Sequence, residues 1–273
     1  MSPTTIAHGG TDPSVDGSLL AYHIAGKPGV LIVDGHPGRV DGTHPAVGGN
    51  RIAVLSGDVI KVRQTAGAPF ALSFPAPGAD ALAVSAEWVA WRAHAADGDT
   101  IYAVPLAGGA PKRVAQSREL GRPSLAGHRV AYHVTGRTSS RIVVADLATG
   151  RKTTLRRERR ALLINPSLHD GELAYVRSYY KRQELRIGPR RKRSVHRDHK
   201  LWSMVPTGRR DAGHDPGKQH HKHGWPKTLW ARPRAGVSST LWTTALGEGH
   251  AYVTVLRQVA GEPLAVKILR VAA

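Results

Sequence analysis

A short segment in which alanine is followed by an aromatic or branched residue recurs six times along the 273-residue chain. The repeated alanines are Ala21, Ala53, Ala90, Ala131, Ala174 and Ala251. They are 32, 37, 41, 43 and 77 residues apart. The first four spacings indicate one structural unit of about 40 residues repeated along the chain, and the last is one period plus an insertion of about 35–40 residues.

Strand and turn signals follow each alanine segment in the same order. In the third repeat, a strand-forming run at 101–104 comes next, and a glycine turn then leads into an edge-like run at 108–114. Asp-Gly pairs such as Asp170-Gly171 predict hairpin turns, because glycine tolerates the positive φ of a tight turn. Proline-containing segments precede the alanines and are predicted as turns; they are 13–17, 44–45, 123–127 and 165–171. No stretch has a sustained helical period.

A repeat of this kind predicts an all-β, six-bladed β-propeller, because a lone four-stranded sheet cannot cover both of its faces, whereas stacked blades bury one another. The last repeat ends without an outer strand. We therefore expect the N-terminal segment 4–7 to pair with 265–271 and close the ring, which removes the open edges. The chain is predicted to be one propeller domain over 1–273, with an insertion at 189–234 between repeats five and six.

The repeat resembles the WD40-like repeats of TolB-type bacterial propellers. Repeats four and five carry the likeness, through Pro123, Ala131-Tyr132, Ile142, Asp146-Leu147 and Gly150, and through Pro166, Asp170-Gly171 and Ala174-Tyr175. The resemblance implies a binding scaffold of a kind that bacteria often export. The chain as given has no signal-peptide pattern at its start, so the sequence leaves its localisation open.

The formal charge of +19 lies mainly in one region. Residues 176–234 hold 17 Lys and Arg against 4 Asp and Glu, whereas residues 1–150 hold 13 against 11. One hypothesis is that this stretch binds phosphates or another polyanion by releasing counterions, with stacking on the interleaved Trp202, Trp225 and Trp230. The candidate polyanion-binding residues are Arg190, Arg191, Lys192, Arg193, Arg197 and Lys200. The plainer alternative is a solvated basic loop on the propeller rim.

The composition argues against a metal or cofactor site. The chain has no cysteine, which excludes disulfides and thiolate-ligated metals. The insertion contains His196, His199, His214, His220, His221 and His223, but their spacing matches no defined metal site and the surrounding cations oppose a divalent ion. We predict no cofactor and no metal. The most apolar stretch, 79–96, is interrupted by charged residues, so no membrane span is expected.

No common catalytic motif occurs in the sequence. His23 and His133 follow the alanine–tyrosine pair in two repeats, where they either face a ligand in the central channel or, more commonly, are satisfied side chains at strand ends. We therefore predict a non-enzymatic binding or scaffold protein with a protein or cell-surface polymer as partner. Polyanion binding through 176–234 is one alternative, and a hydrolase or lyase with its site in the central channel is another, because propeller active sites leave little local signature.

Overall fold

The structure is a computed structural model that describes residues 4–24, 27, 29–33, 38–65, 69–179, 182–189, 199–204, 229–231, 237–247, 249–259 and 265–272. Strands and turns make up these residues, and no helix occurs among them. Within the same ranges, no helix is long and apolar enough to cross a membrane.

The strands form six sheets, numbered here in chain order. Sheet 1 contains β2 (Gly10–Asp16), β3 (Leu19–Ile24), β4 (Val30–Val33) and β5 (Gly38–Val40). Sheet 2 contains β6 (Thr43–Gly48), β7 (Arg51–Ser56), β8 (Val59–Gln64) and β9 (Leu72–Pro75). Sheet 3 contains β10 (Ala79–Val84), β11 (Trp88–Ala95), β12 (Gly98–Pro105) and β13 (Lys112–Ser117).

The second half of the chain supplies the other three sheets. Sheet 4 contains β14 (Ser124–Ala126), β15 (Arg129–Thr135), β16 (Ser140–Asp146) and β17 (Lys152–Glu158). Sheet 5 contains β18 (Leu162–His169), β19 (Glu172–Tyr179), β20 (Arg182–Pro189), β21 (His199–Met204) and β22 (Leu229–Ala231). Sheet 6 contains β23 (Val237–Gly247), β24 (His250–Val259), β25 (Ala265–Ala272) and the N-terminal strand β1 (Thr4–His8).

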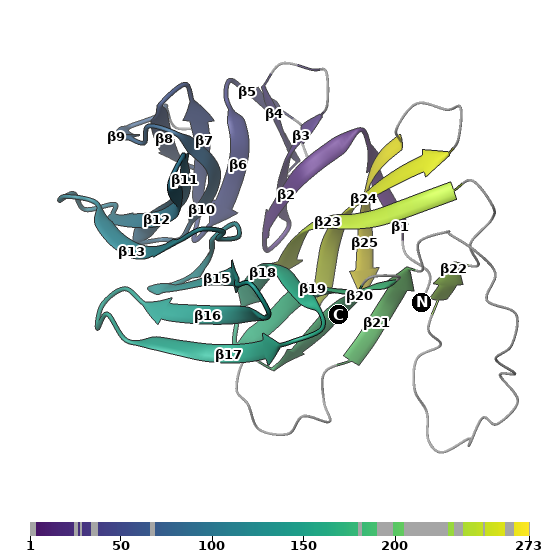
Figure 1. The fold of residues 1–273 in the computed structure, drawn as a ribbon. Helices are drawn as coiled ribbons and strands as arrows, with labels where there is room; N and C mark the ends of the chain where they lie inside the picture. The colour runs from purple at the N-terminus through teal and green to yellow at the C-terminus, as the bar shows by residue number, and fades with distance from the viewer. Residues whose placement is uncertain are drawn as a thin grey trace, which may run out of the picture.

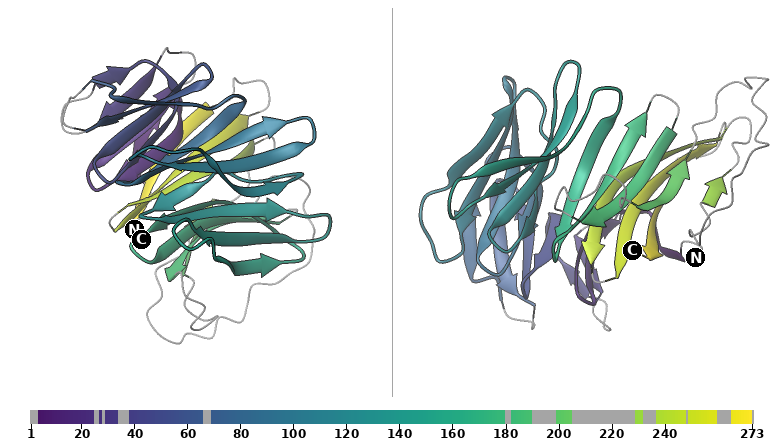
Figure 2. Two further views of the ribbon diagram at one scale, coloured as in Figure 1. Left: turned by 90° about the vertical axis from the view of Figure 1, so that its left-hand side faces the viewer. Right: turned by 90° about the horizontal axis from the view of Figure 1, so that it is seen from below.

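The sheets are arranged in a ring around a central axis, as expected for a β-propeller (Figures 1 and 2). The first strand of each chain repeat is innermost, and β2, β6, β10, β14, β18 and β23 contact one another in that order and back to β2. A separate cluster of buried apolar residues lies between each sheet and the next, including between sheet 6 and sheet 1. The stability of the ring therefore comes from sheet-to-sheet packing.

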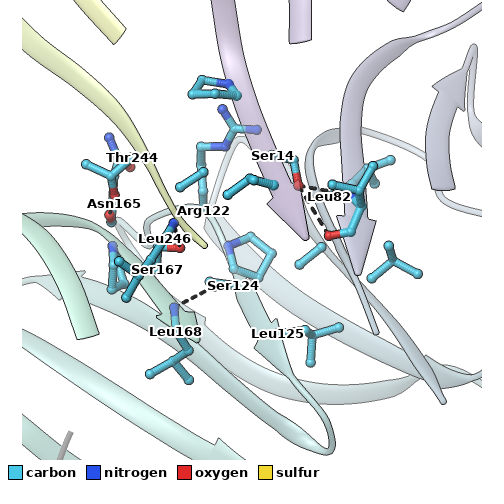
Figure 3. A pocket seen from close by; sticks show the side chains of 18 of the residues that line it. Ser14, Leu82, Arg122, Ser124, Leu125, Asn165, Ser167, Leu168, Thr244 and Leu246 are labelled. Carbon is cyan, nitrogen blue, oxygen red and sulfur yellow. Dashed lines mark hydrogen bonds between the residues drawn. The ribbon is translucent and has the colours of Figure 1, made fainter. Parts of the chain in front are cut away.

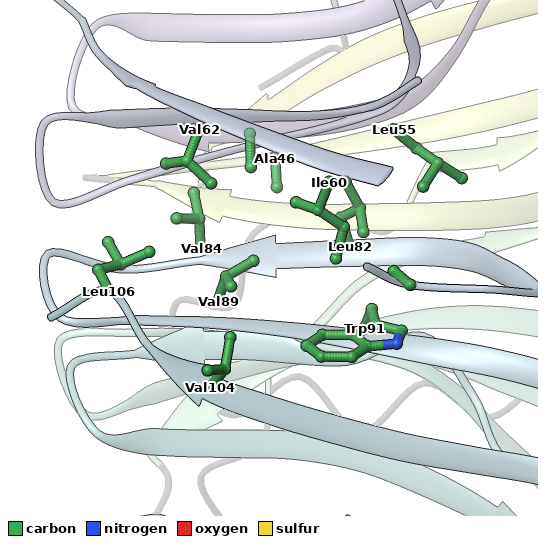
Figure 4. Packing of buried hydrophobic residues seen from close by; sticks show 12 residues of the cluster. Ala46, Leu55, Ile60, Val62, Leu82, Val84, Val89, Trp91, Val104 and Leu106 are labelled. Atoms are coloured by element: carbon green, nitrogen blue, oxygen red, sulfur yellow. The ribbon is translucent and has the colours of Figure 1, made fainter. Parts of the chain in front are cut away.

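The repeated alanines lie at these sheet-to-sheet contacts. All six, Ala21, Ala53, Ala90, Ala131, Ala174 and Ala251, have 0% of their surface exposed. Between sheets 2 and 3, Trp91 follows its alanine and packs over a layer of Val, Ile and Leu side chains (Figure 4). A larger side chain at any of these alanine positions would meet the neighbouring sheet, because such interiors are close-packed.

The ring closes through the two ends of the described chain. β1 pairs antiparallel with β25, with Thr4 opposite Arg270 and Thr5 opposite Leu269. The prediction that 4–7 would pair with the last repeat is confirmed. The edge that β25 would otherwise offer to another chain is covered by this pairing.

Two other predictions need correction. The proline-containing segments that precede the alanines are not turns: they form the innermost strands β2, β6, β14 and β18, and only the Gly-containing ends of these segments turn. The interval 189–234, predicted as a loop, contains β21 and β22. β21 pairs with β20 as an outer strand, and β22 pairs parallel to β21.

Candidate functional site at the channel mouth

The central channel is narrow and is lined by all six innermost strands. It encloses a cavity of about 70 Å³. Figure 3 shows the lining side chains, which include Ser14, Leu82, Arg122, Ser167 and Leu246. Because a water molecule needs roughly 10–15 Å³ of such space, this cavity has room for a few water molecules.

A polar residue followed by proline lies in or just before four of the innermost strands, as Asp12-Pro13, His44-Pro45, Arg122-Pro123 and Asn165-Pro166. Proline is tolerated there because the channel side of each innermost strand is a sheet edge, where a missing N–H costs no ladder hydrogen bond. Asp12, His44 and Asn165 have positive φ angles of 53°, 48° and 50°, and a β-bulge interrupts the pairing at each. Asp, His and Asn are among the residues that adopt this conformation most readily.

Serine side chains join neighbouring innermost strands across the sheet boundaries. Ser14 Oγ accepts a hydrogen bond from the Val47 N–H at 2.9 Å. Two further bonds of this kind run from Leu168 N to Ser124 Oγ at 2.9 Å and from Leu246 N to Ser167 Oγ at 2.8 Å. Each serine accepts a hydrogen bond from a backbone N–H at the channel edge of the next sheet, where no further strand is present to accept it. These bonds fix the distance between neighbouring innermost strands around the channel.

An ion pair crosses the mouth of the channel. Arg122, from sheet 4, donates through Nη1 to Asp12 Oδ1 in sheet 1, and two sheets separate these residues in either direction around the ring. The side chains are only 18% and 19% exposed. His44 lies beside the pair, with its Nδ1 3.6 Å from Asp12 Oδ2. Burial raises the pKa of Asp12, but Arg122 and His44 outweigh it and hold that pKa well below its usual range.

Sheet 3 holds the segment that carries Arg122. The Arg92 guanidinium makes two bonds to Asp80, at 2.8 and 2.6 Å, and a third to the Leu120 carbonyl at 2.8 Å. Asp99 Oδ2 accepts the Leu120 N–H at 2.8 Å, and its Oδ1 lies 2.6 Å from His94 Nδ1. Both polar groups of the Leu120 backbone are thus bound, so the following residues, including Arg122, have a defined position.

His133 completes the support of the mouth from sheet 4. Gly121 donates to the His133 carbonyl at 2.9 Å, and a Cβ on Gly121 would lie 1.8 Å from His133 Nδ1, so only glycine fits there. The same Nδ1 accepts the Asn165 N–H at 3.1 Å, which places the ring proton on Nε2. Burial, together with nearby Arg92, lowers the pKa of His133 to about 4. His133 is therefore a buried neutral side chain whose Nδ1 is hydrogen-bonded within the protein, which favours the commoner of its two predicted roles.

Most of the polyanion-binding residues predicted from the sequence fall outside the described residues. These are Arg190, Arg191, Lys192, Arg193 and Arg197. Lys200 lies in β21, where it pairs opposite Arg186, and its side chain is outside what the structure describes. His199 is also in β21, and the other histidines of the insertion lie outside the described ranges. Among the residues described, no group of three His, Asp or Glu is placed to hold a metal.

Sequence reasoning missed the residues that gather at the mouth. The signal was nevertheless present, because Asp12, His44, Arg122 and Asn165 each stand nine residues before a repeated alanine. Equal offsets in a repeat protein place side chains at equivalent positions in successive units. In a ring, those positions converge on the axis.

No protein-family model matches the sequence, and no curated protein matches it. Solved structures do match. TolB from Acinetobacter baumannii superposes with a TM-score of 0.50 at 13% identity, over 93% of this chain and 59% of that one. The fold is that of TolB-like β-propellers. This chain thus spans 59% of the length of that TolB chain.

Propellers of peptidases superpose equally well. The β-propeller domain of the Trilobed protease from Pyrococcus furiosus gives a TM-score of 0.50 at 10% identity, over 97% of this chain and 94% of that one. An acylaminoacyl peptidase gives 0.53 at 12% identity, over 95% and 45%. The structural relatives therefore include both TolB and peptidases, and at these identities the likeness extends to the fold alone.

Proposed function

We propose that this chain is a non-enzymatic binding propeller that engages a protein or a cell-surface polymer through the face of the ring where the channel mouth lies. We take each of the six sheets as one blade, since one apolar cluster lies between each sheet and the next. The binding face carries the starts of the innermost strands and the hairpins between the second and third strands.

The ion pair that crosses the mouth is the observation that carries this proposal. Arg122 and Asp12 bind each other, and the cavity beyond them measures about 70 Å³. Ligand pockets for small molecules are usually about 300–1,000 Å³. A partner is therefore expected to meet the mouth as a surface of fixed shape and charge rather than to enter the channel. Loops positioned by a rigid scaffold commonly supply such surfaces.

Site-specific photo-crosslinking tests which face is used. A crosslinking amino acid at exposed Glu119 samples the mouth face, and the matched control at exposed Thr149 samples the turns of the opposite face. We expect a crosslinked species from source-cell extract at position 119 and not at 149, competed by unlabelled wild-type protein. The captured partner, once purified, should bind a variant with glutamine at Arg190, Arg191, Lys192 and Arg193 with unchanged affinity. Equal crosslinking from both faces would contradict the proposal.

A second candidate function is polyanion binding through the insertion, favoured by the 17 Lys and Arg against 4 Asp and Glu in 176–234. Binding to heparin or DNA through phosphate-like contacts weakens steeply as salt concentration rises. Replacing Arg190, Arg191, Lys192 and Arg193 with glutamine should then reduce both the affinity and its salt dependence. Binding that these replacements leave unchanged would exclude this segment as the polyanion site.

A further inference from the structure

An open groove lies between sheets 3 and 4, on the outer side of the ring and away from the channel. Its volume is about 270 Å³. β13 forms one wall, and β15, β16 and β17 form the other. Leu120, Val134 and Val143 give it an apolar floor, and the other side chains that line it are mostly polar.

The groove between sheets 3 and 4 is open because some of its side chains are small. The equivalent positions between sheets 2 and 3 carry large side chains. Between sheets 2 and 3, Trp91 stacks on Tyr102 with ring centroids 5.6 Å apart, and Phe74 packs against the same cluster. In sheet 4 the equivalent pair is Tyr132 and Val143, which lie opposite each other as Trp91 and Tyr102 do. Val143, which takes the place of the Tyr102 ring, leaves the space between sheets 3 and 4 open.

Tyr132 lines this groove and supplies a hydroxyl to it. The side chain lines the cavity although the residue is only 3% exposed. None of the described residues forms a hydrogen bond with its hydroxyl. Burial raises the pKa of Tyr132 while nearby Arg141 lowers it, with a net rise, so the hydroxyl stays protonated and able to donate.

The charged groups of the groove are all positive. Arg141 and Lys152 line it, and no aspartate or glutamate does. No ion pair of Arg141 or Lys152 occurs among the described residues. Gln116 also lines the groove, and because Arg113 donates to its carbonyl at 3.0 Å, its amide N–H groups are left as donors. Hydroxyls of Thr153 and Thr154 add further hydrogen-bonding capacity.

We propose that this groove binds an acidic sugar, a single pyranose ring bearing a carboxylate, as found in uronate-containing polysaccharides. The carboxylate would bind Arg141, the ring hydroxyls would bind Tyr132 and Gln116, and the C–H face of the ring would pack on Val143. The volume lies just below the usual range for ligand pockets, roughly 300–1,000 Å³, which suits one ring. An acidic peptide offers the carboxylate without several adjacent hydroxyls, and the number of polar groups in the groove favours the sugar.

Isothermal titration calorimetry with D-glucuronate, D-glucose and acetate tests the proposal on the whole chain. We expect glucuronate to bind at least tenfold more tightly than glucose or acetate, since the site uses both the charge and the ring. Glucuronate that binds no better than glucose would overturn the role of the cations. Acetate that binds equally well would overturn the role of the ring, and tighter binding of an oligoglutamate would replace the sugar with a peptide.

Three substitutions locate the site. Arg141→Gln should weaken glucuronate binding about tenfold, as expected for a hydrogen bond to a charged group, and Tyr132→Phe about two- to tenfold. Arg151→Gln is the matched control, because Arg151 is exposed and neighbours Lys152 without lining the groove, and it should change the affinity less than twofold. Unchanged affinity in R141Q with a native thermal melt would refute the proposal. The groove and the channel mouth are separate, so this test and the crosslinking test can fail independently.

Discussion

Breaking the ion pair across the channel should destabilise the whole ring. Replacing Asp12 with Asn leaves Arg122 without its charged partner while both remain about four-fifths buried. Removing one member of a buried pair typically costs about 3–5 kcal/mol. Because these side chains retain some exposure, we expect about 2–3 kcal/mol for Asp12→Asn and a similar loss for Arg122→Met.

A double-mutant cycle measures the coupling between the two residues. The four proteins are wild type, Asp12→Asn, Arg122→Met and the double variant, each unfolded in urea and followed by circular dichroism. The double variant should lose less than the sum of the single variants by about 1–2 kcal/mol, as expected for residues in contact. Arg129→Met is the control, because Arg129 is 40% exposed and 3.9 Å from Asp146, and an exposed pair contributes about 0–1 kcal/mol.

The pH dependence of folding stability tests the Asp12–Arg122 ion pair in a second way. The pKa of Asp12 in the folded state lies below its unfolded value of about 3.9. Its stabilising contribution is therefore complete above the unfolded pKa and is lost as pH falls from there toward the folded pKa. The gap in stability between wild type and Asp12→Asn should narrow below about pH 4. A coupling energy near zero, or a gap that does not change with pH, would refute the claim that the ion pair stabilises the ring across the channel.

Three further predictions concern the supports of the ring. Ser167→Ala removes the acceptor of the buried Leu246 N–H and should lower the free energy of unfolding in urea by about 1–3 kcal/mol. The control Ser18→Ala, at an exposed site, should lower it by less than about 0.5 kcal/mol. Equal losses would contradict the bridging role of Ser167. His133 should titrate near pH 4 by NMR. Because its folded pKa lies below the unfolded value of about 6.5, its contribution to folding stability should be lost as pH falls from 6.5 toward 4. A titration near 6.5 would show that the imidazole is accessible to solvent. Deleting residues 4–8 should expose the β25 edge and promote self-association in light scattering, and a monomer with an unchanged melting temperature would show that β1 does not close the ring.

The period of the sequence was enough to predict the β-propeller and its closure. Neighbouring sheets approach closely at one position on the second strand of each unit, and only a small side chain fits there. The repeated alanine therefore marks a packing contact, and all six of these alanines are completely buried. The innermost strands were missed because proline and bulges hide their alternation. Pro123-Ser124 and Pro166-Ser167 have the composition of turns, yet Ser124, Pro166 and Ser167 lie in innermost strands at the channel edge. The candidate groove was also not predictable, because it depends on which side chain of one sheet faces which of the next.

The residues at the mouth of the channel show that a position's offset from the repeated alanine can predict which side chains face one another. Asp12 and Arg122 stand at the same offset before their alanines, in the first and fourth repeats, and are 110 residues apart in sequence. In a ring of six sheets, units three apart are opposite each other, so equivalent side chains in those units point at one another across the axis. Opposite charges at that offset then close the channel, whereas like charges would repel and hold it open. The pairing of charges between repeats three apart is therefore a sequence signal for whether the channel of a six-sheet ring is closed.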